Sequence, residues 1–263
     1  MTANLFLPVS VIGYVVAIFT ATLRTVYRAE GARRATSVLL IVTWLAHCGA
    51  VVQQGLRIGR VPLTTGAEYL LVLGWVVLSL HLFLWFRANV EVSGLVLPPL
   101  AGVLCFAAMQ LLGVHPARPD APADGWFLLH TTISTIGMAT LCVAFAMSVL
   151  YLIQDRALKA KRTLALLGRL PSLGRADQLG HRALVVGFVL LTIGILAGVI
   201  VTAEDAERPI EVGAKQILPV LAWIVFAIVL GARALLGFRG RKSAYLTIAG
   251  FVLGLATVVG MTL

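Results

Sequence analysis

The five histidines are the residues of this chain whose type could carry chemistry. His47 and His130 each fall inside a long apolar run, while no carboxylate falls deep in such a run. The sequence shows no Ser/His/Asp arrangement and no HExxH motif, the signatures of hydrolases and zinc proteases. A neutral imidazole ring is a common metal ligand. We therefore expect metal or haem ligation from these side chains, and no enzymatic reaction.

Two histidines on neighbouring helices could hold a haem iron between them, because imidazole is the usual protein ligand of haem iron. We expect His130 to be the iron ligand. For His47 two roles stay open, that of a second axial ligand and that of a hydrogen-bonding residue in the core. The other three histidines are expected to be interfacial or solvated, and they are His81, His115 and His181.

His130 begins a stripe of small residues. Ser134 and Gly137 follow it at helical spacing and share its face, since residues three and four apart lie one above the other. Such a stripe allows either the close approach of another helix or contact with a flat ligand.

Cations next to the apolar runs could pair with the propionates of a haem. Arg57 and Arg60 follow the second run, and Lys215 precedes the seventh. Carboxylates such as Glu68 lie on the same predicted side and could instead form ordinary surface ion pairs with these cations. Both alternatives stay open.

Long apolar helices are the elements that must position these residues. Hydrophobic residues make up 60% of the chain and charged residues 12%, and the mean hydropathy is +0.98, so water is not its main solvent. Stretches long enough to cross a bilayer occur at roughly 5–23, 36–54, 67–86, 92–113, 127–153, 183–202, 216–236 and 244–262. We predict an all-α, polytopic bundle of about eight spans that forms one domain over 1–263. Most tryptophans are interpreted as anchors near span ends.

The basic residues predict how the bundle is oriented. Sixteen Lys and Arg residues fall in the odd-numbered connections and five in the even-numbered ones. By the positive-inside rule the odd connections are cytoplasmic and both termini lie on the non-cytoplasmic side, in a bacterial inner (plasma) membrane. Topology thus accounts for most of the net charge of +10, and no nucleic-acid partner is expected.

The longest connection, residues 155–182, mixes basic residues with leucines at near-helical spacing. Such a segment is predicted to lie on the cytoplasmic surface, where each cation gains about 1 kcal/mol from anionic lipid. Membrane lipid is therefore an expected partner. Docking of a cytoplasmic protein is the alternative.

Several blocks of the chain, in this order, resemble the cytochrome c assembly family, which includes CcsA-type haem-handling proteins and short HemX-like relatives. The blocks are 61–75 (VPLTTGAEYLLVLGW), 125–162 (beginning GWFLLHTTIS), 170–200 (beginning LPSLGRADQLGHR) and 223–254 (containing GFRGRKSAY). The resemblance covers most of the chain, and the order of the blocks is more specific than any one block.

The resemblance implies a haem b cofactor and a membrane partner subunit of cytochrome c assembly. Of the family's haem histidines, His130 has a clear counterpart here and His47 a looser one. The family's external segment is Trp-rich, whereas residues 202–216 (TAEDAERPIEVGAKQ) contain no Trp and keep only Lys215 of its ending. Leu230 and Gly231 stand where the family carries a Leu-His pair.

Three hypotheses of function follow. The first is a non-enzymatic membrane protein that binds and handles haem in cytochrome c biogenesis. The second is a HemX-like regulator or scaffold that has lost haem transfer and acts through its basic loop on a cytoplasmic enzyme of haem biosynthesis. A small-solute transporter is third, because no pair of broken helices stands out in corresponding halves.

Overall fold

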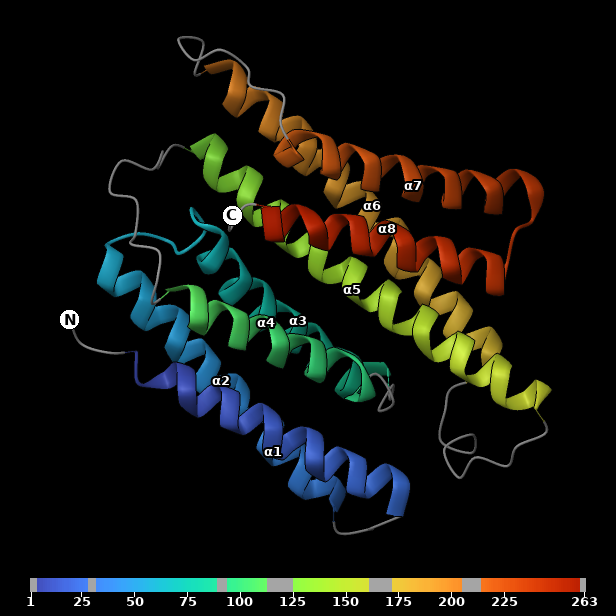
Figure 1. Ribbon diagram of the computed structural model, residues 1–263, viewed down its shortest axis with the longest axis horizontal. Helices are drawn as coiled ribbons and strands as arrows, with labels where there is room; N and C mark the ends of the chain where they lie inside the picture. The colour runs from blue at the N-terminus through green and yellow to red at the C-terminus, as the bar shows by residue number, and fades with distance from the viewer. Residues whose placement is uncertain are drawn as a thin grey trace.

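The structure of the chain, a computed structural model, describes residues 4–27, 32–88, 94–112, 125–160, 172–204 and 214–260 (Figure 1). Within these ranges the regular structure is helical throughout, which confirms the all-α prediction. The helices are α1 (Phe6–Tyr27), α2 (Ala32–Ile58), α3 (Gly66–Ala88), α4 (Leu97–Leu112), α5 (Gly125–Lys159), α6 (Leu173–Glu204), α7 (Ala214–Leu236) and α8 (Arg241–Gly260).

Six helices of the described ranges are long and apolar enough to cross a membrane, namely α1, α2, α3, α5, α6 and α7. The two helices outside this group are α4, which is apolar but has only 16 residues, and α8, which has 20 residues. Large apolar side chains cover the outside of the bundle, with Phe19 62%, Val103 64% and Leu196 60% exposed. Contiguous apolar surface of this kind requires lipid around it. The chain is therefore a multi-pass membrane protein.

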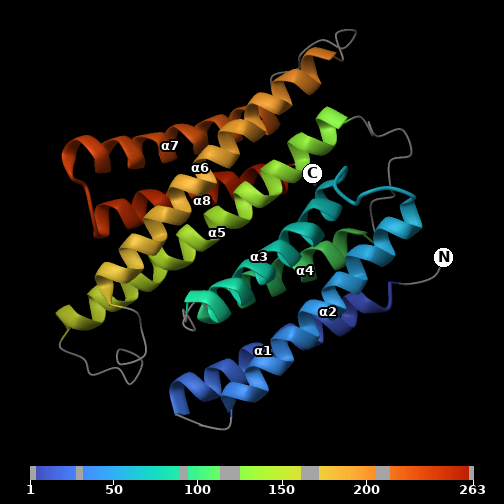
Figure 2. The same cartoon turned by 180° about the vertical axis from the view of Figure 1, so that it is seen from behind.

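Consecutive helices pack as antiparallel pairs, α1 with α2, α3 with α4, α5 with α6 and α7 with α8. Helix α5 also contacts α3 and α8, so it joins the two halves of the bundle. Figures 1 and 2 show α3 and α4 lying between α2 and α5. The positions of His47 in α2 and His130 in α5 are set by this arrangement.

The interface between α5 and α6 is the most extensive in the described part of the chain, and glycine residues allow the two helices to approach each other closely. A Cβ atom at Gly137 would lie 3.1 Å from the Cβ of Leu190, and one at Gly187 would lie 2.8 Å from the side chain of Leu141. The stripe that begins at His130 therefore faces another helix, which is the first of the two alternatives predicted for it.

Three of the five tryptophans lie in the middle of helices rather than near their ends. Trp44 stacks on Trp75 with ring centroids 6.0 Å apart and 22° between planes, and its Nε1 donates to Ser79 at 2.7 Å. Trp223 donates to Thr192 at 2.9 Å. The interpretation of most tryptophans as interfacial anchors is wrong for these three, because their rings stack on aromatic rings of neighbouring helices. Hydroxyl groups on those helices also satisfy the indole donors of Trp44 and Trp223.

Candidate functional site

His130 lies in the second turn of α5, against α6. Its Nδ1 atom is 2.6 Å from the carbonyl oxygen of Gly194. A carbonyl can only accept, so Nδ1 carries the proton and donates it. In the neutral ring Nε2 then keeps its lone pair. The half-buried imidazole thus has one nitrogen fixed by the protein and one nitrogen with the electron pair that a metal ion needs.

His47 has a different environment, because its side chain is completely buried between three helices. Nε2 donates to the carbonyl oxygen of Leu71 in α3 at 3.0 Å. Nδ1 must therefore be unprotonated, and it accepts from the hydroxyl of Tyr14 in α1 at 2.9 Å. Both nitrogens are used by hydrogen bonds, which favours the core role over the axial-ligand role for His47.

The two histidines are not brought together. The contacts of His47 are with Tyr14 in α1 and with Leu71 and Gly74 in α3, whereas His130 packs on α6. Helices α2 and α5 share no extensive contact in the described ranges, and α3 and α4 lie between them (Figure 2). One haem held by both imidazoles does not fit this arrangement.

The hydrogen bond of Tyr14 to His47 leads to a stability prediction. Tyr14→Phe leaves a buried imidazole nitrogen without a partner, and we expect a loss of about 1–3 kcal/mol in the free energy of unfolding. Thermal unfolding in detergent measures this loss. Tyr245→Phe is the control, since Tyr245 is 44% exposed and its replacement should change little. An unfolding temperature of Tyr14→Phe equal to that of the control would contradict the structural role.

Of the predicted propionate partners, Arg60 is engaged locally. Its guanidinium contacts Glu68 at 2.9 Å, and Glu68 also accepts from the backbone N–H of Thr64 at 3.0 Å at the start of α3. Arg57 is exposed in the last turn of α2, where no ion pair is formed with another described residue. The side chain of Lys215 lies outside the described residues. For Arg60 the structure therefore shows the alternative of a local ion pair.

The other histidines differ from expectation in part. His81 was expected to be interfacial or solvated, but it is completely buried and packs edge-on against Trp85 at 5.6 Å between ring centroids. That prediction is wrong because the segment that precedes α4 packs on the ring, and a Cβ at Gly94 would lie 3.3 Å from the His81 ring. His181 is half-buried, and His115 lies outside the described residues.

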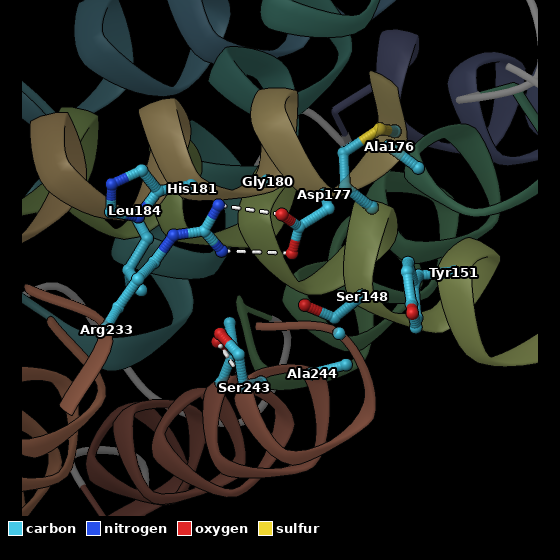
Figure 3. Close-up of a pocket in the computed structure, with 13 residues that line it drawn as sticks. Ser148, Tyr151, Ala176, Asp177, Gly180, His181, Leu184, Arg233, Ser243 and Ala244 are labelled. Atoms are coloured by element: carbon cyan, nitrogen blue, oxygen red, sulfur yellow. Dashed lines mark hydrogen bonds and ion pairs between the residues drawn. The ribbon is translucent and has the colours of Figure 1, made fainter. Parts of the chain in front are cut away.

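A small polar cavity lies between α5, α6, α7 and α8 (Figure 3). Its α5 residues, Met147, Ser148 and Tyr151, belong to the C-terminal half of that helix, whereas His130 lies near its start. The volume of the cavity is about 20 Å³, roughly the space of one water molecule. Arg233 of α7 forms two hydrogen bonds with Asp177 of α6, at 2.9 and 2.7 Å. The buried Nδ1 of His181 has no hydrogen-bond partner within the described part of the chain. Hydroxyl groups complete the lining, from Ser148, Tyr151, Ser243 and Thr247.

Sequence reasoning missed this cluster because it placed Asp177 and Arg233 in connections. Helix α6 begins at Leu173, about ten residues before the predicted span at 183, and it carries Asp177 into the bundle, while Arg233 lies in the last turn of α7. The signal was present as helical spacing, since Asp177, Gly180 and Leu184 share one face.

No group of three or more His, Cys, Asp or Glu side chains that could hold a metal ion occurs among the residues with described positions. A multi-ligand protein metal centre is thus not formed in this part of the chain. Ligation of the iron of a haem needs only one or two side chains. The geometry of His130, with Nε2 keeping its lone pair, would allow such ligation.

Comparison with known proteins identifies the family of this chain. The family described as "Cytochrome C assembly protein" matches residues 4–262. The chain belongs to this family. The cytochrome c biogenesis protein CcsA of Guillardia theta is 28% identical over 213 residues, which cover 74% of this chain and 71% of the relative. The protein of the same name from Gloeothece citriformis is 26% identical over 253 residues, covering 78% and 77%.

A further CcsA, from Chlamydomonas reinhardtii, is 30% identical over 214 residues, which cover 78% of this chain and 59% of the relative. The resemblance drawn from the ordered blocks is thereby confirmed. This chain is a membrane protein of the cytochrome c biogenesis (CcsA) family.

Proposed function

We propose that this protein binds haem b through His130 and handles it in cytochrome c biogenesis, without an enzymatic activity of its own. The observation that supports the proposal is the tautomer of His130. Its Nδ1–H donates a hydrogen bond to the carbonyl of Gly194, so Nε2 of this half-buried ring keeps the lone pair that could bind iron. The family membership favours the same use of the imidazole.

The residues present fit a haem with one axial imidazole from this chain. His130 would hold the iron, and Gly194 would orient the ring. Arg57 is the exposed cation that stays available for a propionate, whereas Arg60 is occupied by Glu68. Haem, when bound, would supply the iron porphyrin that the protein handles, and any further iron ligand would come from outside the described residues.

The predicted orientation gives this site a direction. If odd-numbered connections are cytoplasmic, the start of α5 faces the non-cytoplasmic side. Haem would then be presented on that side, and a membrane partner subunit of cytochrome c assembly would supply the missing ligand. We propose a bacterial plasma membrane as the location, since the charge distribution obeys the positive-inside rule. The relatives named above include a protein of Chlamydomonas reinhardtii as well as one of Gloeothece citriformis.

The second hypothesis, a HemX-like regulator that acts on a cytoplasmic enzyme of haem biosynthesis, gains no specific support. The relatives named above are CcsA proteins. Residues 161–171 of the basic loop that would contact such an enzyme lie outside the described residues. We therefore propose haem handling alone.

Purification from cells supplied with haem tests the proposal. We expect the protein to carry haem b through detergent extraction and to show a Soret band in a reduced-minus-oxidised spectrum. With only one ligand from the described residues of this chain, the reduced form should also bind carbon monoxide, and the Soret band should shift on its addition. A protein that stays free of haem, both after expression and after mixing with haem, would contradict the proposal.

A further inference from the structure

The ring of His130 lies directly on two glycines of α6, one turn apart. We propose that Gly194 and Gly198 are positioning residues for His130: Gly194 fixes its tautomer and Gly198 leaves the space that its ring occupies. The functional importance of this positioning rests on the proposed function, since the tautomer of His130 decides which ring nitrogen would bind the haem iron. The tautomer itself can be measured without haem.

The space at position 198 is already filled by the imidazole. A Cβ atom added to Gly198 would lie 2.8 Å from Cε1 of His130, 2.9 Å from Nδ1 and 3.5 Å from Nε2. Contacts below 3.0 Å are not tolerated, so one of the two groups must move. The ring is the free end of a side chain and can rotate aside without disturbing a backbone. Gly198→Ala should therefore fold, but with the ring displaced from its present position.

The hydrogen bond to Gly194 depends on the same contact. A Cβ at position 198 would lie 2.9 Å from Nδ1, the atom that donates to the carbonyl of Gly194 at 2.6 Å, so a ring that rotates aside carries this donor away from its acceptor. Ser134, one turn along α5, also packs on this glycine, and a Cβ at Gly194 would lie 2.5 Å from the Ser134 hydroxyl oxygen. Because Gly194 has no side chain, α5 can approach α6 closely at this position, and the Gly194 carbonyl can orient the ring of His130.

The hydrogen bond has a chemical effect on the ligand. An imidazole that donates its second N–H to a carbonyl is a more basic ligand than a free one, and loss of such a partner typically lowers metal affinity about 10–100-fold. A more basic ligand stabilises ferric over ferrous iron. Gly198→Ala should therefore bind haem more weakly and raise its midpoint potential.

The experiment compares Gly198→Ala with Gly231→Ala, the same change in the membrane-spanning helix α7. Position 231 is a matched control, because a Cβ there would meet no atom within 4 Å. Nitrogen-15 spectra of histidine-labelled, haem-free protein report which ring nitrogen of His130 is protonated, and its signal is assigned by its loss in His130→Ala. The haem-loaded proteins then give affinity and midpoint potential.

We expect the Nδ1–H tautomer in wild type and in Gly231→Ala, and its loss in Gly198→Ala together with a fall in haem affinity of about tenfold or more. An Nε2–H tautomer in wild type would overturn the inference, whatever the haem result. So would a Gly198→Ala protein that matches wild type in tautomer, affinity and potential. If wild type shows the Nδ1–H tautomer but binds no haem, the proposed function fails and the positioning of His130 stands.

Discussion

Replacement of His130 by alanine is expected to abolish the Soret band of the haem-loaded protein, whereas replacement of His47 by leucine should leave it in place. His130 is half-buried near the start of α5, and its Nε2 keeps the lone pair while Nδ1 donates to Gly194. Loss of an axial ligand should lower haem affinity well over tenfold, which is more than about 1.4 kcal/mol of binding free energy. His47 holds Tyr14 and Leu71 together, so its loss should appear in stability instead.

The measurement is the absorption spectrum normalised to the amount of folded protein, with the unfolding temperature recorded alongside. His47→Leu should unfold at a lower temperature than wild type while each folded molecule keeps its haem. An equal loss of the Soret band in both variants would support a bis-histidine site and contradict the separation of α2 from α5. An unchanged spectrum in His130→Ala would show that the iron is held elsewhere.

Replacement of Arg233 by methionine is expected to destabilise the bundle strongly, because it leaves the carboxylate of Asp177 without its partner. The two side chains are only 11% and 18% exposed and share two short hydrogen bonds. Removal of one member of a buried ion pair costs about 3–5 kcal/mol, and the partial exposure here favours the lower end of that range. Thermal unfolding in detergent measures the change.

A double variant separates the unpaired charge from the lost packing. Arg233→Met combined with Asp177→Asn should recover part of the stability, since no uncompensated carboxylate remains. Arg241→Met is the surface control, because Arg241 is 47% exposed where it contacts Asp155 at 3.3 Å, and we expect little change. A single variant at Arg233 as stable as this control would mean that the cavity is open to water.

Hydropathy was sufficient to predict the fold because lipid imposes a simple rule, that each apolar run of about 20 residues becomes one helix. It could not predict where helices continue beyond the apolar run. Helix α5 extends to Lys159 and α6 begins at Leu173, so charged residues expected in a connection belong to helices. The polar cavity is formed in part by residues of those extra turns, and a hydropathy profile therefore could not predict it.

His130 could be selected from the sequence because an ionisable side chain in an apolar run has few reasons to be there. Its hydrogen-bond partner could not be predicted, since the carbonyl of Gly194 is 64 positions away. Every residue has a backbone carbonyl, so the sequence does not indicate which one accepts the bond. The same holds for His47. Its hydrogen bonds to Tyr14 and to the carbonyl of Leu71 come from two other helices, and they distinguish a core residue from a ligand.

The contact between His130 and Gly198 also limits how sequences of this family can drift. A chain that keeps the imidazole at position 130 must keep a residue without a side chain at position 198, because a single methyl group would enter the space of the ring. Once the histidine is lost, position 198 is released and alanine or serine becomes acceptable. The two positions, 68 residues apart and on different helices, should therefore change together or not at all.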